Sequence, residues 1–307
     1  MSAEVEYQTE RLDHLGIVAG VCQEAGIAEW LDKQAGDSRR SVSVGKATVA
    51  MVLNGLGWSL RQLYLVPQYF ENKPVEHLLG EGISADMLND DCLGRTLDWL
   101  YEHDVTMLFA GLALQARRRF GIAAQHLHID TTSFSVSGDY ATQEEGDPVA
   151  LAITYRYSRD HRADLKQWML ALATTHDGDL PIFLRPLNGN SSDKEHLSAA
   201  VKEVMAQLRE QLPEEQEQPI TVFDSGGYSE ANMKSYNDAK IWWISRVPET
   251  SSVAKTALAE VDEQWSPLSD GSGEYVLRTM ELPQGKERWV IVRTHAQCQR
   301  LRNFAPR

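Results

Sequence analysis

The hydrophobic positions of the first 120 residues recur at helical spacing. Four runs place apolar residues three and four positions apart, and they begin at Leu15, Val49, Leu93 and Val105. Residues at this spacing share one face of a helix, so the pattern predicts a helical N-terminal domain over residues 1–122. We expect Asp104 to cap the last of these helices and Gly121 to end it.

The pattern changes to that of strands from residue 125. Apolar, β-branched and aromatic residues, separated by polar turns, predict three strands over 126–136, 149–157 and 167–175. The next expected elements are a helix over 194–212, a strand over 220–224, a helix over 229–238 and a strand over 241–247. Short links make the first three strands antiparallel, and the helix that follows permits the fourth strand to lie parallel to, and beside, the first. This order predicts an α/β fold with an RNase H-like mixed β-sheet over residues 123–248.

The remaining residues, 249–307, predict the start of a β-rich insertion. The segments EYVLRTMEL and ERWVIVRTH, joined by PQGK, are typical of a β-hairpin. In the preceding strand IWWISRV we interpret Trp242 and Trp243 as core residues, with base stacking as the alternative.

Composition and charge narrow the class of protein. The chain has 307 residues and no apolar run of about 18 residues, so no membrane partner is expected. Its N-terminus lacks the pattern of a secretion signal, and its three cysteines are far apart, so we expect a cytoplasmic protein. The net charge of −14 by itself disfavours a nucleic-acid partner, but the surplus is uneven: residues 125–235 hold nine basic and 18 acidic side chains, whereas 236–307 hold 10 and nine.

Two aspartates stand in strands that are otherwise apolar or hydroxylic. Asp130 precedes Thr131, and Asp224 ends a short apolar strand and precedes the sequence Ser-Gly-Gly. Aspartate is disfavoured in strands, and a buried carboxylate is costly unless it meets a cation or hydrogen-bond donors. In the expected sheet the two lie on adjacent parallel strands, close enough to share a metal ion. The alternative is that each aspartate merely ends its strand or caps a turn.

A different metal site is also conceivable on the first strand. His126, His128 and Asp130 form a His-x-His-x-Asp sequence on one strand face, a spacing that binds zinc or iron in some hydrolases. This would predict a metal-dependent hydrolase. Such enzymes need a repeated strand–helix barrel with further ligands, which the order of elements here does not supply.

Four ordered motifs resemble those of a known family. The string YSRDHRADLKQ, residues 157–167, resembles the YSRDHRPDLKQ signature of prokaryotic insertion-sequence DDE transposases in the broad insertion-sequence-four superfamily, with Ala163 in place of proline. HIDTTSFSVSGDY, LNGNSSDKEHL and VFDSGGYSEANM resemble the first-Asp, GN-x-x-D and second-Asp segments of the same enzymes. The helical region 10–120 is similar to the N-terminal domain of one branch, where DNA binding or dimerisation is the implied role.

The resemblance implies a site and a chemistry. Asp130 and Asp224 match the first two catalytic, metal-binding carboxylates, which hold Mg²⁺, or Mn²⁺ as a substitute, in this family. Supporting residues on the matched motifs are Thr131, Asn190, Asp193 and Gly226. The implied activity is metal-dependent DNA strand cleavage and strand transfer at insertion-sequence ends. Its implied partners are terminal inverted repeats and target DNA, with a homo-oligomer as the active complex.

The same motifs contain basic side chains that could contact DNA. Those on the signature segment are Arg156, Arg159, Arg162 and Lys166. Arginine and lysine neutralise backbone phosphates, so one interpretation is DNA binding near the metal site. The other is that Asp160 and Asp164 pair with them in a surface turn, and the sequence favours neither.

The family pattern also predicts a third acid that we do not find. It is expected on a helix after the β-rich insertion, within Tyr-x-x-Arg-x-x-x-Glu, and no such segment precedes Arg307. We therefore expect a C-terminally truncated transposase that is inactive in strand transfer by itself. The alternative function is that of a DNA-binding repressor.

Overall fold

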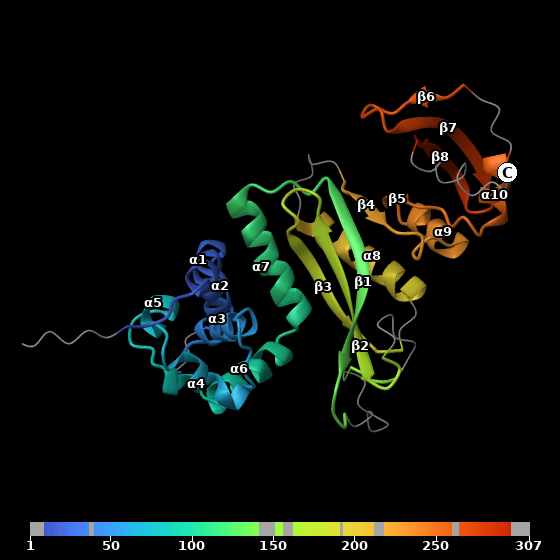
Figure 1. Ribbon diagram of the computed structural model, residues 1–307. Helices are drawn as coiled ribbons and strands as arrows, with labels where there is room; N and C mark the ends of the chain where they lie inside the picture. Colours follow the sequence, from blue (N-terminus) through green and yellow to red (C-terminus); the bar gives the residue numbers. More distant parts are fainter. Residues whose placement is uncertain are drawn as a thin grey trace, which may run out of the picture. The chain divides into compact units, whose positions relative to one another are not determined.

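The computed structural model describes residues 9–36, 40–140, 151–155, 162–190, 193–211, 218–259 and 264–295 (Figure 1). Its contacts divide the chain into two compact units. The first contains Met1–Ala123 and Asp177–Leu184, and the second contains Ala124–His176 and Arg185–Arg307. Among the described residues, none of the helices combines the length and the apolar character needed to span a membrane.

The N-terminal unit is helical, as the periodicity predicts. Its α-helices are α1 (Leu15–Ala25), α2 (Ile27–Ala35), α3 (Val44–Gly55), α4 (Val66–Phe70), α5 (Val75–Leu79), α6 (Asp90–Glu102) and α7 (Val105–Phe120), with short 3₁₀ turns η1 (Leu63–Leu65) and η2 (Ala85–Leu88). Their apolar faces form one buried cluster that includes Leu15, Leu53, Phe70 and Leu93. The helical prediction for this region is confirmed.

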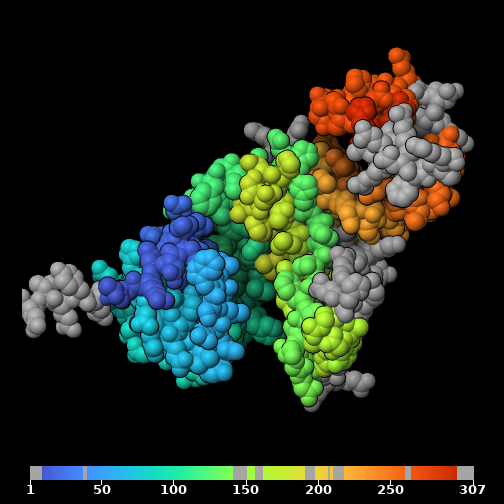
Figure 2. All heavy atoms as spheres, viewed as in Figure 1, coloured from blue at the N-terminus to red at the C-terminus, as the bar shows by residue number. Residues whose placement is uncertain are grey.

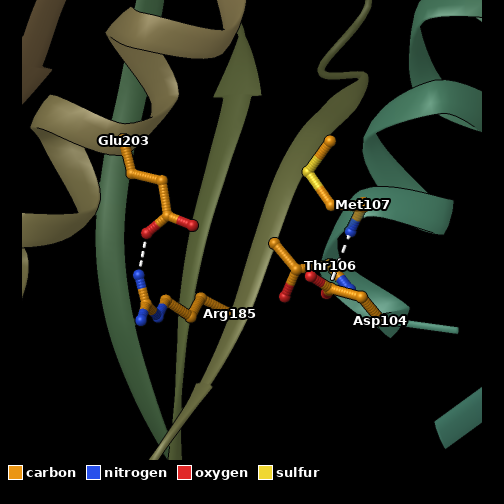
Figure 3. Close-up of polar contacts among 5 residues, drawn as sticks. All are labelled: Asp104, Thr106, Met107, Arg185 and Glu203. Atoms are coloured by element: carbon orange, nitrogen blue, oxygen red, sulfur yellow. Dashed lines mark hydrogen bonds and ion pairs between the residues drawn. The ribbon is translucent and has the colours of Figure 1, made fainter. Parts of the chain in front are cut away.

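Local hydrogen bonds set the ends of α7. The Oδ1 atom of Asp104 accepts from the backbone N–H groups of Thr106 and Met107, at 3.1 and 3.3 Å (Figure 3). These donors have no partner within the helix, so the side chain stabilises its first turn. Gly121 ends the helix in the left-handed conformation, with a φ angle of 65°. Both predicted ends of this helix are confirmed.

The second unit contains most of a mixed five-stranded sheet, one strand of which begins within the segment Asp177–Leu184. The strands of this sheet are β1 (His126–Val136), β2 (Lys166–Thr175), β3 (Pro181–Leu187), β4 (Ile220–Phe223) and β5 (Trp242–Ser245), in the spatial order β3-β2-β1-β4-β5. β1 pairs with β2 antiparallel and with β4 parallel, and β4 pairs with β5 parallel. Helices α8 (Asp193–Gln211) and α9 (Glu230–Asp238) follow β3 and β4. The predicted α/β class and RNase H-like strand order are confirmed.

Two details of the first three strands were predicted incorrectly. We expected 149–157 to be the second strand, but within the described residues 151–155 only Thr154 forms a bridge, to Gln167. The third strand is instead β3, in the segment PIFLRPL, for which we predicted no strand. Pro181 and Pro186 make this segment unlike a strand in the sequence, because proline has no N–H to donate to a strand ladder. β3 lies at the edge of the sheet, where prolines are tolerated.

The two faces of the sheet differ. Leu127, Ile129, Ala171 and Ala173 are buried on one face, and α8 packs against β1 and β2. The alternating residues His128, Asp130 and Thr132 are exposed on the opposite face of β1. Figure 2 shows strands of this sheet, in green and yellow, at the molecular surface. Aspartate at position 130 is therefore tolerated because its side chain alternates away from the core.

An ion pair connects α8 to the edge of the sheet. The guanidinium of Arg185 on β3 points toward the carboxylate of Glu203 on α8 and pairs with it (Figure 3). Both side chains are partly exposed, so the pair contributes little to the free energy of unfolding. The buried residues Val201, Val204, Met205 and Leu208 hold this helix in place.

The C-terminal part contains the predicted hairpin. Helix α10 (Ser252–Ala259) precedes β6 (Ser266–Pro267), β7 (Gly273–Leu282) and β8 (Gly285–Thr294), which form a three-stranded sheet. β7 and β8 pair antiparallel down to Leu282 and Gly285, so the connection contains only Pro283 and Gln284. Trp289 and Ile291 of β8 pack with Ala254 and Ala257 of α10 into a small separate core. The β-hairpin prediction is confirmed.

The prediction that both tryptophans of β5 are core residues is wrong for Trp242. Its side chain is 54% exposed. β5 lies at the sheet edge, and one of its faces borders a groove of about 810 Å³ whose other wall is β8. Trp243 is half-buried, and its indole N–H donates to the Oδ1 atom of Asn237 at 3.1 Å.

Candidate functional site

The pairing of β1 with β4 aligns the two aspartates. His126 pairs with Ile220, Leu127 with Thr221 and His128 with Val222. The same register, continued by two residues, places Asp130 opposite Asp224. Side chains two residues apart on a strand share a face, so Asp130 lies on the face of His128. The fold thus brings together two carboxylates that are 94 positions apart in the printed sequence.

Asp130 lies in the middle of β1, within the antiparallel ladder to β2 and two residues beyond the last β1–β4 pair. Its neighbour across the antiparallel pair is Leu172. Its side chain is exposed, and its Oδ1 atom accepts from the backbone N–H of Thr131 at 2.7 Å. Thr131 itself is buried on the opposite face of the sheet. Asp130 therefore keeps carboxylate lone pairs available to a ligand from solvent.

Asp224 lies at the end of β4, where the chain leaves the sheet. Its Oδ1 atom accepts from the backbone N–H of Gly226 at 2.8 Å. Its backbone carbonyl accepts from the N–H of Gly227 at 3.2 Å and from the hydroxyl of Ser245 at 3.1 Å. The carboxylate is exposed, so its orientation is set by the turn while its second oxygen faces solvent.

Gly226 leaves the space that the Asp224 carboxylate occupies. A Cβ atom added at Gly226 would lie 2.9 Å from the Oδ1 atom of Asp224. That separation is shorter than a normal contact between carbon and oxygen. The glycine is therefore explained by close approach of the carboxylate to the backbone, since its N–H donates to the same oxygen.

A buried side chain from α9 makes a hydrogen bond to the turn that follows Asp224. Asn232 of α9 is 7% exposed, and its Nδ2 atom donates to the carbonyl of Gly227 at 3.0 Å. The adjacent Ser229 caps α9, with its hydroxyl accepting from the N–H of Asn232 at 3.2 Å. We did not single out Asn232 from the sequence, although it lies inside the VFDSGGYSEANM motif. Its burial on the Met233 side of α9 gives it a role in holding the turn.

The second and third motifs also meet in the structure. Gln167, at the end of the YSRDHRADLKQ string, is 2% exposed, and its Nε2 atom donates to the carbonyl of Gly189 at 3.1 Å. A Cβ atom at Gly189 would lie 1.9 Å from the carbonyl oxygen of Gln167, so only glycine fits there. The backbone N–H of Gly189 donates to the carbonyl of Ala152 at 2.8 Å. The YSRDHRADLKQ and LNGNSSDKEHL motifs therefore pack against each other through Gln167 and Gly189.

This contact lies at the far end of β1 from the aspartates. Gln167 pairs with Ser135 and Lys166 with Val136, whereas Asp130 pairs with Leu172. Lys166 is thus opposite a residue six positions beyond Asp130, about 20 Å along a strand that rises roughly 3.3 Å per residue.

The basic residues of the signature segment differ in their surroundings. Arg162 forms two hydrogen bonds of 2.8 Å to Asp164, and the guanidinium lowers the pKa of that carboxyl. This is the surface pairing that the sequence left open, so a phosphate would compete with Asp164 for Arg162. The ammonium of Lys166 donates to the carbonyl of Tyr140. Arg156 and Arg159 lie outside the described residues.

The remaining supporting residues, Asn190 and Asp193, follow β3 in the chain. Asn190 is exposed and follows Gly189, at the Gln167 end of the sheet. Asp193 begins α8, and its side chain lies outside the described part of the structure. Their role in steadying a metal site stays a prediction.

No third acid joins the aspartate pair within the described residues. Among them, no group of three or more His, Cys, Asp or Glu side chains is arranged to hold a metal ion. This also counts against the His-x-His-x-Asp zinc site. His128 is instead within 3.2 Å of the ring of His176, measured between Nε2 and Nδ1, and His126 lies edge-on to the same ring.

The chemistry of the pair fits a divalent cation with oxygen ligands. One exposed carboxylate lies on β1 and the other directly follows the adjacent parallel strand β4, and neither forms an ion pair with another described residue. Mg²⁺ is commonly bound by one or two protein carboxylates, with water and phosphate oxygens completing its octahedron. The arrangement therefore supplies two oxygen ligands and leaves the remaining positions open.

Comparisons with known proteins give limited further information. Residues 7–114 match a family model described as a domain of unknown function, DUF4277. No curated protein matches the sequence.

Among solved structures, the chain is similar to a piggyBac transposase synaptic complex with hairpin DNA, at 13% identity and a TM-score of 0.36, over 95% of this chain and 54% of that one. It is also similar to the Mos1 mariner paired-end complex with Mn, at 12% identity and a TM-score of 0.28, over 73% of this chain and 67% of that one. A Mos1 paired-end complex with the left transposon end matches at 11% identity and a TM-score of 0.25, over 70% and 62%. The chain spans about half the length of the piggyBac protein.

Proposed function

We propose that this chain is part of an insertion-sequence transposase of the DDE type, and that Asp130 and Asp224 are its first two metal-binding carboxylates. The observation that carries the proposal is the parallel register of β1 and β4, which, continued two residues past its last pair, aligns Asp130 with Asp224 on interior strands of the sheet. The four motifs with family resemblance are independent of that geometry and point to the same two residues. DNA is the proposed substrate, and its ends are those of the mobile element.

The proposed reaction is phosphodiester hydrolysis followed by transesterification. A divalent ion at such a site supplies charge stabilisation for in-line displacement at phosphorus. Asp130 and Asp224 would bind that ion, and the Gly226 N–H keeps one oxygen of Asp224 fixed while the other remains free to coordinate. Lys166 and Arg162 would contact the DNA backbone farther along the strand, where they fix its path rather than act on the reacting phosphate.

A second candidate function follows from the number of acids. The described residues bring no third Asp or Glu to the pair. A site with two carboxylates would bind metal more weakly than one with three, because it offers fewer ligands and less negative charge. The second candidate is therefore a DNA-binding regulator that occupies element ends without cutting them.

One assay separates the two functions. A supercoiled plasmid that carries the DNA flanking the coding sequence is incubated with the purified chain and Mg²⁺ or Mn²⁺, and nicking is measured on a gel. Binding to the same DNA is measured in EDTA by mobility shift. Transposase chemistry predicts metal-dependent nicks that Asp130→Asn and Asp224→Asn abolish. A regulator predicts a mobility shift without nicks.

A matched control separates loss of a metal ligand from loss of charge. Asp238 is exposed at the end of α9 in the same unit, so Asp238→Asn removes one carboxylate away from the site. Nicking by this variant should equal that of the parent chain. Equal nicking by the parent, Asp130→Asn and Asp224→Asn would contradict the transposase proposal.

A further inference from the structure

Glu287 of β8 is a buried carboxylate that the proposed reaction does not use. It is 4% exposed. Its Oε2 atom accepts from the hydroxyl of Tyr228 at 2.8 Å and from the indole N–H of Trp289 at 2.7 Å. Its Oε1 atom accepts from the Nε2 atom of Gln284 at 2.9 Å. A carboxylate removed from water needs such donors, and in the described residues they are neutral groups rather than a cation.

Tyr228 connects this carboxylate to the turn after β4. It lies four residues after Asp224 in the sequence, and its backbone N–H donates to the carbonyl of Ser225 at 3.3 Å. Its hydroxyl also accepts from Gln284 at 3.3 Å. Burial, together with the neighbouring Glu287, raises the pKa of Tyr228, so the hydroxyl remains a donor across the physiological range. Trp243 of β5 meets the Tyr228 ring edge-on, with 6.3 Å between ring centroids.

The hairpin has apolar packing of its own in addition to these polar contacts. Its two long strands pair over their whole length, and Trp289 and Ile291 already form an apolar core with α10. Glu287 lies on the buried side of β8, at an alternating position where apolar side chains are usual. The network joins the hairpin residues Gln284 and Trp289 to Tyr228 outside the hairpin, so it ties the turn after β4 to β8.

We propose that Glu287 is a positioning residue for Asp224. By fixing the Tyr228 hydroxyl, it holds residues 224–228 in the turn in which the Gly226 N–H orients the Asp224 carboxylate. The inference rests on the proposed role of Asp224 as a metal ligand. It also gives the β-rich segment a function, because contacts to β8 would then change the metal affinity of the sheet.

The test measures the Mn²⁺ affinity of the full chain by electron paramagnetic resonance, together with amide hydrogen exchange at Gly226 and Gly227. Glu287→Leu removes all three acceptor contacts, and Tyr228→Phe removes only the hydroxyl. Each should weaken Mn²⁺ binding about tenfold, at the low end for residues that orient metal ligands. Each should also speed exchange in the turn, because local opening costs less free energy.

Two further variants separate positioning from general stability. Glu287→Gln keeps one side-chain oxygen that can accept from Tyr228 and Trp289, so it should restore most of the affinity. Glu281→Gln makes the same charge change on β7, at an exposed residue paired with Lys286, and should leave both readouts unchanged. If Glu287→Leu does not fold, Tyr228→Phe carries the test, since it adds no bulk.

The outcomes distinguish this inference from the proposed function. If Asp224→Asn lowers Mn²⁺ affinity while Tyr228→Phe and Glu287→Leu leave affinity and exchange at parent values, the positioning role is wrong and the metal site stands. If Asp224→Asn leaves Mn²⁺ affinity unchanged, the proposed metal site itself is wrong.

Discussion

The two aspartates are held by different parts of the molecule in different ways. Asp130 lies inside a long strand, in the ladder to β2 and two residues past the last pair with β4, and its carboxylate accepts from a backbone N–H. Asp224 lies where β4 ends, and side chains from α9, β5 and β8 fix the turn that carries it. One carboxylate therefore depends on the core beneath the sheet, and the other depends on a polar network around a turn.

In the proposed site, this difference combines one carboxylate on a paired strand with one on an adjustable turn. A strand residue moves only if the sheet moves, because each of its neighbours is paired. A turn residue can be displaced by changing a single hydrogen bond, at a cost of about 1–3 kcal/mol for a buried group left without a partner. Substitutions beneath β1 should therefore destabilise the whole fold, whereas substitutions around the turn after β4 should mainly lower metal affinity.

The largest expected effect is in the strand that carries Asp130. Leu127→Ala removes a side chain that is fully buried beneath the sheet. We expect it to lower the free energy of unfolding by about 3 kcal/mol, through lost burial and the cavity left behind. Urea unfolding monitored by circular dichroism measures this. A loss below about 1 kcal/mol would show that β1 is not anchored by its buried face.

The next effect is in the turn that carries Asp224. Asn232→Ala removes the donor to the Gly227 carbonyl and leaves that buried group unsatisfied. We expect a loss of about 2 kcal/mol in unfolding free energy. Amide exchange should rise at Gly226 to Tyr228 and stay unchanged at Ile129 and Thr131. Equal acceleration in both regions would contradict the proposed separation between them.

A smaller effect, confined to metal affinity, is expected at Gly226. Gly226→Ala places a Cβ atom 2.9 Å from the Asp224 Oδ1 atom, so the carboxylate must rotate. Mn²⁺ affinity should fall about tenfold, which corresponds to roughly 1.4 kcal/mol. Gly20→Ala is a control, because its added Cβ meets nothing within 4 Å. Unchanged affinity in Gly226→Ala would mean that this rotation does not reach the ligand geometry.

The smallest effect is expected at the ion pair between β3 and α8. Arg185→Ala should change the free energy of unfolding by no more than about 0.5 kcal/mol, because both charges are partly exposed. Denaturant unfolding of the parent and the variant in low and high salt checks this. A loss above about 2 kcal/mol would place this pair among the contacts that hold the sheet.

The sequence predicted the parts of the fold that depend on periodicity. The helices of the N-terminal unit, the strands at 126–136 and 220–224, and the C-terminal hairpin each have an apolar face that repeats at the expected spacing. β3 was missed because Pro181 and Pro186 are poor strand residues except at an edge, and edge position is decided by the whole sheet. Trp242 was misjudged for a related reason, since β5 is also an edge strand.

The two aspartates of the candidate site could be selected from the sequence, but the residues that hold them in position could not. Asp130 and Asp224 stand out because aspartate is unusual in strands, and the order of elements predicts their pairing. Glu287 and Asn232 could not be assigned roles, because their partners are set by tertiary packing. A signal for Glu287 exists in the alternation of β8, where it falls in phase with the buried Trp289 and Ile291. An acidic residue at a strand position that alternates with buried apolar residues indicates a buried polar network.

The most direct test of the shared metal site is a double-mutant cycle on Mn²⁺ affinity, with the parent chain, Asp130→Asn, Asp224→Asn and the double variant. Because both carboxylates are proposed to bind the same ion, each single substitution should remove most of the affinity and the double variant should lose little more. Losses that add independently, or an affinity that neither substitution changes, would contradict a site shared by Asp130 and Asp224.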